Sequence, residues 1–209
     1  MNYKNIIWDW NGTILNDLDV CLVTLNDMLR RRNIPEISKI KYTNLFRFPV
    51  VDFYKEIGFD LSNESFDEVS IDFVTTYNNN SADLELQPGV LAALQELNRA
   101  GVKQYILSAL EQNSLEKLLK FYNISHYFES VSGSDNIYGN GKFGQGEKLV
   151  ATSNIVTSES LMVGDTTHDA EIARMLGFSV VLYAGGHNSK QRLEKDALVI
   201  EDFSELLNL

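Results

Sequence analysis

The chain has 209 residues, of which 44% are hydrophobic, and its formal net charge is −11. That length suits one large domain, or one domain that carries a smaller insert, and the apolar content is enough for a buried core. The acidic balance argues against a nucleic-acid backbone or an anionic membrane as a partner. It allows a small anionic substrate, because a bound cation can reverse the local field.

Cysteine usage and the N-terminal sequence bear on location. The single cysteine, Cys21, cannot form an internal disulfide, which fits a reducing compartment, and we interpret it as a buried apolar thiol. No signal-type segment and no run of 18 apolar residues occurs in the sequence. We therefore expect a cytoplasmic protein that does not enter a membrane.

The first half of the chain is predicted to be mainly helical. A short apolar strand over residues 4–9 comes first, and apolar residues then recur at helical spacing over residues 17–32. Further helices are expected over residues 50–58 and 63–77. The polar run at residues 78–81 marks the end of this helical part.

The second half alternates between strands and helices. Strands are predicted over residues 103–108, 129–132, 160–164, 178–183 and 197–200, and helices over residues 89–100, 113–122, 146–153 and 168–176, with a short helix at the end. This alternation predicts an α/β fold with a doubly wound, Rossmann-like parallel sheet that binds ligands at the carboxyl ends of its strands. Residues 1–15 and 86–209 would form this core, and residues 16–85 a small helical cap inserted after the first strand.

Four chemically useful side chains follow predicted strands or lie in adjoining loops. Asp9, Ser108 and Asp165 each come at a strand end, and Lys142 lies in the glycine-rich connection 138–146. Each one alone has an ordinary explanation, since Asp and Ser often cap helices and glycine loops are common. Together they supply a nucleophile, two carboxylates suited to Mg²⁺ and donors for phosphoryl oxygens.

These motifs carry a family resemblance. D-x-N-G-T at residues 9–13, Ser108, Lys142 and G-D-x-x-x-D at residues 164–169 resemble the four motifs of haloacid dehalogenase-like phosphatases. The sequence is most similar to the phosphoglycolate phosphatase-like branch, which has a small helical cap directly after the first motif. The resemblance spans essentially the whole chain, and it implies magnesium-dependent hydrolysis of a small phosphorylated metabolite.

The resemblance also implies roles for individual residues. Asp9 would be the nucleophile that forms an aspartyl-phosphate, and Mg²⁺ would be held by Asp9, Asp165 and the backbone carbonyl of Asn11. Ser108, Ala109 and Lys142 would bind the phosphoryl group, with Lys148 as the alternative lysine. Asp169 would orient either metal-bound water or the lysine, and Thr13 would support the groups that contact the metal and the phosphate.

Position 11 departs from the family pattern, because most such phosphatases have a second aspartate there as the general acid and base. Asn11 does not titrate in this range, so acid-base help worth roughly 10²–10⁴-fold is lost. The favoured hypothesis is a phosphatase that is slow, that acts on good leaving groups, or that recruits another acid from the cap. A phospho-ligand-binding protein without turnover is one alternative. A phosphonate hydrolase that uses a cap lysine (Lys39, Lys41 or Lys55) is another, whereas Asp165 argues against a metal-free dehalogenase.

Several other residues receive weaker expectations. His168 is expected at a helix surface or behind the metal site, and His187 in a turn near the active site where it would contact substrate. Arg47 would either bind a second anionic group of the substrate or lie at the surface. Trp8 is expected in the core and Trp10 against the cap. The sequence determines neither the substrate nor the oligomeric state.

Overall fold

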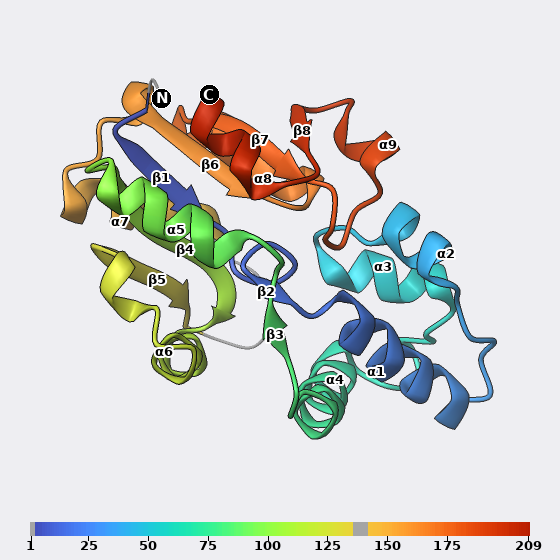
Figure 1. The fold of residues 1–209 in the computed structure, drawn as a ribbon. Helices are drawn as coiled ribbons and strands as arrows, with labels where there is room; N and C mark the ends of the chain where they lie inside the picture. The colour runs from blue at the N-terminus through green and yellow to red at the C-terminus, as the bar shows by residue number, and fades with distance from the viewer. Residues whose placement is uncertain (1–2, 136–141) are drawn as a thin grey trace.

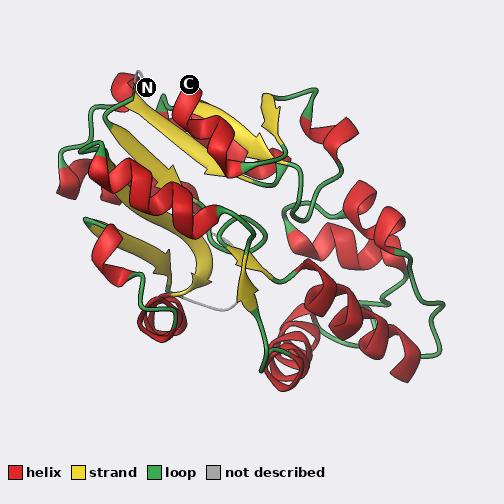
Figure 2. Ribbon diagram, viewed as in Figure 1, coloured by secondary structure: helices red, strands yellow, loops and turns green. Residues whose placement is uncertain are grey.

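A computed structural model describes residues 3–135 and 142–209, and its centre is a parallel sheet (Figures 1 and 2). In the described residues this sheet has six strands in the order β5-β4-β1-β6-β7-β8, and neighbouring strands are parallel throughout. The predicted doubly wound α/β fold is thereby confirmed. The strands are β1 (Asn5–Trp8), β4 (Lys103–Glu111), β5 (Ser130–Ser134), β6 (Ser160–Gly164), β7 (Ser179–Tyr183) and β8 (Leu198–Ile200).

Helices cover both faces of the sheet. Ile6 and Trp8 of β1 belong to an apolar cluster with residues of α5, α6 and the C-terminal 3₁₀ helix η3, whereas Ile7 belongs to a second cluster with residues of α7 and α8. Because both faces are buried, the central strands contain continuous apolar runs, residues 6–8 in β1 and residues 161–163 in β6. The core helices are α5 (Val90–Arg99), α6 (Gln112–Phe121), α7 (Lys142–Ser153), α8 (Thr167–Leu176) and α9 (Lys190–Leu193), with 3₁₀ turns η1 (Ser125–Tyr127), η2 (Thr157–Glu159) and η3 (Phe203–Asn208).

Four helices form a separate unit, here called the cap, beside the ends of the central strands (Figure 1). They are α1 (Leu18–Arg31), α2 (Lys39–Leu45), α3 (Val50–Ile57) and α4 (Phe66–Asn80), and they enclose an apolar cluster of their own. The two connections between cap and core pair as antiparallel strands, β2 (Leu15–Asn16) and β3 (Glu85–Leu86). The proposed domain boundaries at residues 16 and 85 fall within this pair.

Two features of the cap differ from the prediction. Helix α2 was not expected, because it has no apolar stripe: only Tyr42 is buried, and Ile40 is 75% exposed. Its start is specified instead by the Ser38 side chain, which accepts a hydrogen bond from the Lys41 backbone. The polar run at residues 78–80 belongs to α4 rather than to a linker, and Asn80 Nδ2 donates to Thr24 Oγ1 of α1 at 3.2 Å.

Helix α7 begins at Lys142, four residues before its predicted start. The glycines of this segment lowered its apparent helix propensity. At Gly146, however, an added Cβ would lie 2.4 Å from Leu176 Cδ1 of α8, so the glycine permits the close packing of two helices. The described part of the predicted glycine-rich connection is therefore helical, and residues 138–141 lie outside the described residues.

The two tryptophans lie in the same apolar cluster of the core. Trp8 is fully buried, as predicted. Trp10 is also fully buried, and its ring packs on Tyr122 next to α6, so the expected contact with the cap was wrong. The chain turns back after β1, with the Ile14 and Leu15 N–H groups donating to the Trp10 carbonyl, and the Trp10 ring joins the core cluster.

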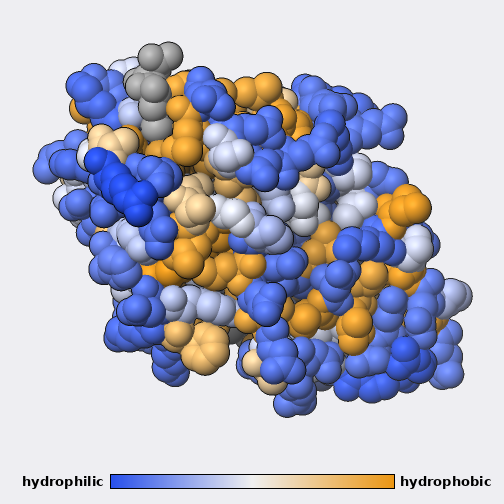
Figure 3. All heavy atoms as spheres, in the orientation of Figure 1, coloured by the Kyte–Doolittle hydropathy of each residue, from blue (hydrophilic) through white to orange (hydrophobic). Residues whose placement is uncertain are grey.

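On the face of the molecule shown in Figure 3, polar residues predominate near the edges, and apolar residues gather nearer the middle, over α5 and over the cap. In the part of the chain that the structure describes, no helix is both long enough and apolar enough to span a bilayer.

Candidate active site

Two neighbouring strands place the two central carboxylates. Asp9 directly follows β1 and Asp165 directly follows β6, and these strands pair with Trp8 opposite Val163. The Asp9 backbone N–H donates to the Val163 carbonyl at 2.8 Å, which extends the pairing up to the site. Asp9 is 7% exposed and Asp165 is fully buried. The parallel sheet thus brings together two side chains that are far apart in sequence.

The turn after Asp9 fits closely around Asp165. Gly12 has a φ of +74°, and a Cβ added there would lie 2.2 Å from Asp165 Oδ2, so only glycine suits this position. Thr13 Oγ1 donates to Asp165 Oδ1 at 3.0 Å, and it lies 3.5 Å from Asp9 Oδ2. The Thr13 hydroxyl therefore lies close to both carboxylates, which is the supporting position expected from the sequence.

Lys142 reaches the carboxylates from the first turn of α7. Its Nζ lies 2.5 Å from Asp9 Oδ1 and 2.5 Å from Asp169 Oδ1, and its side chain is 4% exposed. Lys148, the alternative candidate, lies exposed on the same helix and does not line the cavity at the site. Of the two lysines, Lys142 alone is placed beside the candidate nucleophile.

Asp169 is held in a fixed orientation at the start of α8. Its Oδ2 accepts hydrogen bonds from the Asp165 and Thr166 backbone N–H groups and from Thr166 Oγ1, and Asp169 forms a capping box with Thr166. Its other oxygen, Oδ1, is the one that accepts from Lys142. Asp169 therefore positions the lysine, as expected.

This cluster has three buried carboxyl groups, those of Asp9, Asp165 and Asp169, but Lys142 is the lysine that pairs with them. Burial raises the pKa of Asp9 to about 6, although Lys142 opposes the shift. Burial likewise raises the pKa of Asp165 well above its usual range, with the Asp9 charge adding to the effect. Burial alone would lower the pKa of Lys142, but Asp169 and Asp9 raise it above its ordinary value. Lys142 cannot offset all three carboxylates.

The other two predicted phosphate ligands, Ser108 and Ala109, lie in β4 just after its regular pairing with β5 ends at Leu107. Ser108 is 1% exposed, and its Oγ accepts a hydrogen bond from the Leu110 backbone at 3.0 Å. Ser108 and Ala109 line the same cavity as Asp9 and Lys142. The three predicted phosphate-binding residues, Ser108, Ala109 and Lys142, therefore line one cavity together with the candidate nucleophile.

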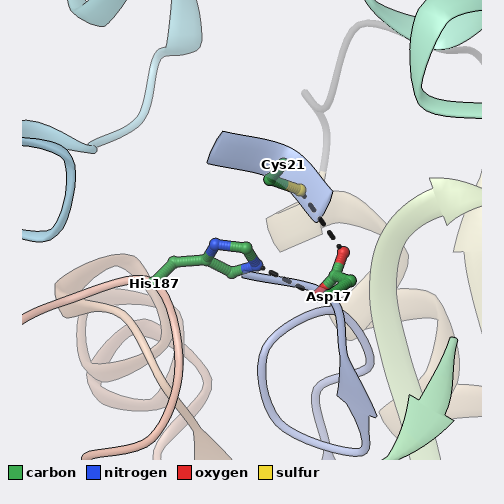
Figure 4. A group of neighbouring side chains, drawn as sticks. All are labelled: Asp17, Cys21 and His187. Atoms are coloured by element: carbon green, nitrogen blue, oxygen red, sulfur yellow. Dashed lines mark hydrogen bonds and ion pairs between the residues drawn. The ribbon is translucent and has the colours of Figure 1, made fainter. Parts of the chain in front are cut away.

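Asn11 is turned toward a buried network. Its side-chain amide donates to Asp17 Oδ2 at 2.7 Å, and the Gly12 backbone N–H donates to Asp17 Oδ1 at 2.8 Å. His187 Nε2 lies 3.2 Å from Asp17 Oδ1, and the other ring nitrogen lies 3.0 Å from the Tyr42 hydroxyl of the cap. Figure 4 shows the His187 ring pointing toward Asp17. Asn11 is thus tied to a carboxylate that joins core and cap.

Asp17 and His187 behave as an ion pair. His187 overcomes the effect of burial on Asp17 and lowers the pKa of that carboxyl. Burial alone would lower the pKa of His187, but Asp17 raises it to about 9. Asp17 was missed in the sequence because an aspartate before a helix is ordinarily a cap. Its side chain makes no capping hydrogen bond here.

Cys21 lies in the same network rather than in purely apolar surroundings. It is buried, and its Sγ lies 3.5 Å from Asp17 Oδ2 (Figure 4). Burial and the neighbouring carboxylate raise the pKa of the thiol well above its ordinary value. Cys21 is therefore held as a neutral thiol, which does not favour a nucleophilic role.

The cap closes over the site through the loop that carries His187. Ser189 N–H donates to the Thr43 carbonyl at 3.1 Å, and Asn188 Nδ2 donates to the Phe46 carbonyl at 2.9 Å. His168 stacks on Phe48 of the cap with ring centroids 4.7 Å apart. It therefore lies at the surface of α8, where it contacts the cap.

Arg47, in the same part of the cap, is not directed at the site. Its guanidinium pairs with Glu56 and donates to the Leu45 carbonyl. It does not line the cavity. The structure therefore fits the expectation that Arg47 is a surface residue, and not the expectation that it binds a second anionic group of the substrate.

A cavity of about 460 Å³ lies between cap and core. Asp9, Ser108, Lys142 and Asp165 line its core side, and residues of α1, α2, α3 and α4 line its cap side. Its volume lies within the range of small-molecule sites. The candidate nucleophile therefore faces a cavity that is large enough for an organic substrate.

Comparisons with known proteins agree with this geometry. The model of the family "Haloacid dehalogenase-like hydrolase" matches residues 6–183. A phosphoglycolate phosphatase of Rhodobacter capsulatus is 24% identical, over 96% of this chain and 94% of that protein. One of Caulobacter vibrioides is 26% identical, over 99% of this chain and 90% of that protein.

Solved structures share the fold. A haloacid dehalogenase-like hydrolase of Streptococcus pneumoniae superposes with a TM-score of 0.73 at 18% identity, over 99% of this chain and 98% of that one. A protein of Haemophilus somnus, described as a predicted phosphoglycolate phosphatase, superposes with a TM-score of 0.78 at 20% identity, over 100% and 98% of the two chains. The family match spans most of the chain, from β1 through β7, and as the four motifs predicted, this protein belongs to the haloacid dehalogenase-like hydrolases.

Proposed function

We propose that this protein is a phosphatase that hydrolyses a small phosphate monoester, with Asp9 as nucleophile and Mg²⁺ as cofactor. The observation that carries the proposal is the position of Lys142, whose Nζ lies 2.5 Å from both Asp9 and Asp169 beside the buried Asp165. The relatives that are named phosphoglycolate phosphatases support the same chemistry.

The donor set suits a magnesium ion. Carboxylate oxygens of Asp9, Asp165 and Asp169 lie within 4.8 Å of one another, and Mg²⁺ prefers oxygen ligands. We assign the ion to Asp9 and Asp165 because they follow two adjacent strands, whereas Asp169 is held by Lys142 and by donors at the start of α8. The Asn11 amide is committed to Asp17, so its backbone carbonyl is the group available as a third ligand. When bound, Mg²⁺ would neutralise charge on the transferring phosphoryl group.

The chain's own residues supply the rest of the chemistry. Asp9 attacks phosphorus through one carboxylate oxygen, and the bond from phosphorus to the leaving oxygen breaks. Lys142, the Ser108 hydroxyl and the Ala109 backbone would donate to the phosphoryl oxygens. Water then attacks the aspartyl-phosphate and releases phosphate and the Asp9 carboxylate. Asp169 keeps Lys142 in place during both steps.

The phosphonate hydrolase alternative receives no support from the cap lysines. Lys39 pairs with Asp19 and is 56% exposed, and Lys55 lies near Asp52 at the surface. Lys41 is exposed as well. None of these three side chains lines the cavity, so none is placed to form a Schiff base with a substrate.

Turnover separates a phosphatase from a protein that only binds phosphorylated ligands. We expect phosphate release from a panel of phosphate monoesters in the presence of Mg²⁺ and its loss with a chelator. Asp9→Asn should abolish release while the thermal unfolding transition persists, and Asp83→Asn, at an exposed loop position, serves as the matched control. Retention of most activity in Asp9→Asn would refute the assigned nucleophile. Binding of the panel without any release in the wild type would support the binding protein instead.

A further inference from the structure

The cap side of the cavity is aromatic and carries no charge. Residues 18–80 contribute fourteen of the lining residues, and eight of these are Phe or Tyr. None of the fourteen is charged, and all of residues 18–80 are described. A substrate held here has its phosphoryl group at Asp9 and its organic part against aromatic rings.

These rings form a packed wall. Phe46 meets Phe53 edge to face at 5.3 Å and Phe48 at 5.6 Å, and it stacks on Tyr42 at 5.3 Å. On the other side of the cap, Phe73 stacks on Tyr77 of the same helix at 5.9 Å. Such edge-to-face and stacked arrangements are the ones that accept a further aromatic ring.

The hydroxyl groups of two of the three lining tyrosines, Tyr42 and Tyr77, already have partners. The Tyr42 hydroxyl lies 3.0 Å from His187 Nδ1, and the Tyr77 hydroxyl donates to Asp17 Oδ2 at 3.1 Å. What they offer to a ligand is therefore their ring faces. A substrate carboxylate finds no cationic partner from residues 18–80. Among the described core residues that line the cavity, the basic side chains are the exposed Lys117, Lys142 and His187.

The leaving oxygen meets a second constraint. The residue placed to protonate it in related phosphatases is Asn11 here, and its amide donates to Asp17. Without an acid, the leaving group must depart as an anion. A phenolic oxygen, with a pKa near 10, does this far more readily than an alkanol oxygen.

Both constraints point to one class of compound. We propose that the substrate is an aryl phosphate monoester, in which the phosphate is attached directly to an aromatic ring that inserts among the aromatic side chains of the cap. This inference rests on the proposed phosphatase function and specifies its substrate. In the first step the P–O(aryl) bond breaks, its electron pair stays on the phenolate oxygen, and that oxygen takes a proton from water.

Four substrates of graded chemistry test the proposal. Phenyl phosphate has a ring and a phenolic leaving group, benzyl phosphate has a ring and an alkyl leaving group, 2-phosphoglycolate has neither, and acetyl phosphate has a good leaving group without a ring. We expect kcat/KM for phenyl phosphate to exceed that for benzyl phosphate by roughly 10²-fold, the lower end of the usual range for a missing general acid. Hydrolysis of 2-phosphoglycolate should be slowest.

Variants of helix α4 test the role of the rings. Phe73→Ala and the milder Phe73→Leu should raise KM for phenyl phosphate, the former by roughly tenfold, the loss expected for one aromatic contact. Both should leave KM for acetyl phosphate unchanged. The matched control is Ile71→Ala on the same helix, because Ile71 is 55% exposed and does not line the cavity. Calorimetric binding to Asp9→Asn should likewise favour phenyl phosphate over 2-phosphoglycolate.

The outcomes distinguish the choice of an aryl phosphate substrate from the phosphatase function itself. Preferred hydrolysis and tighter binding of 2-phosphoglycolate would overturn the aryl assignment and leave the phosphatase intact, as would turnover of acetyl phosphate without turnover of phenyl phosphate. An unchanged KM for phenyl phosphate in both Phe73 variants would also overturn it. Release of phosphate from none of the four substrates would refute the phosphatase function itself.

Discussion

The side-chain amide of Asn11 donates a hydrogen bond to Asp17 Oδ2 over 2.7 Å. Asp17 is fully buried and also accepts from the Gly12 backbone and from Tyr77 of the cap. The residue that departs from the family pattern is therefore part of a network that spans the junction of core and cap. This placement decides what a carboxyl group at position 11 would do.

Asn11→Asp places a second carboxyl group against Asp17. Two carboxyl groups so close share a proton, which raises one pKa and keeps an acid available near neutral pH. We expect kcat for benzyl phosphate to rise by part of the roughly 10²–10⁴ range of acid-base catalysis, and kcat for phenyl phosphate to rise less. Unchanged or lower benzyl phosphate hydrolysis, with Mg²⁺ still bound, would show that the missing acid does not limit turnover.

Lys142→Met should remove phosphate release and also destabilise the fold. The substitution leaves Asp9 and Asp169 buried without their common cation, and breaking a buried ion pair costs about 3–5 kcal/mol. Lys148→Met, on the exposed side of the same helix, should change neither activity nor melting temperature. Phosphate-release assays and thermal melts measure both effects. Equal activities of the two variants would argue against the assignment of Lys142.

Magnesium should raise the melting temperature. Asp9 and Asp165 repel each other unless a cation lies between them, and a ligand at about 100 times its Kd stabilises the native state by about 2.7 kcal/mol. For a domain of this size that corresponds to a shift of roughly 5–10 °C. Asp165→Asn should abolish most of the shift in a melting scan at millimolar Mg²⁺. A wild-type melting temperature that does not respond would exclude a magnesium site here.

The His187–Asp17 pair predicts a loss of stability at alkaline pH. The pKa of His187 is raised from 6.5 to about 9 in the native state, so its contribution is fully present below pH 6.5 and is lost as pH rises through 9. The raised pKa of Asp165 acts in the same direction, so a variant is needed to isolate His187. In melts from pH 6 to pH 10, His187→Gln should lose less stability across this interval than the wild type. Parallel curves would rule out the ion pair.

The sequence by itself determined the chemistry at the strand ends. Short apolar runs, residues 6–8 before Asp9 and residues 161–164 before Asp165, indicate buried parallel strands with carboxylates at their ends, because a short apolar run is a local property of the chain. Register then places the two carboxylates side by side. Asp169 was recognised through the resemblance of G-D-x-x-x-D at residues 164–169 to a family motif, and it lies in the first turn of the helix that follows.

Tertiary structure alone decided how the remaining groups meet. The sequence favoured Lys142 for its glycines, but the chain places it in a helix whose Gly146 packs against Leu176. The contact of Asp17 with Asn11 depends on the turn that follows β1. Nothing local marks Asp17 as the partner of His187, because the two residues are 170 positions apart and meet only in the folded chain. The aromatic wall arises in the same way. Its rings have the spacing of ordinary cap-core residues, and only the packing of four helices turns part of that apolar surface toward Asp9.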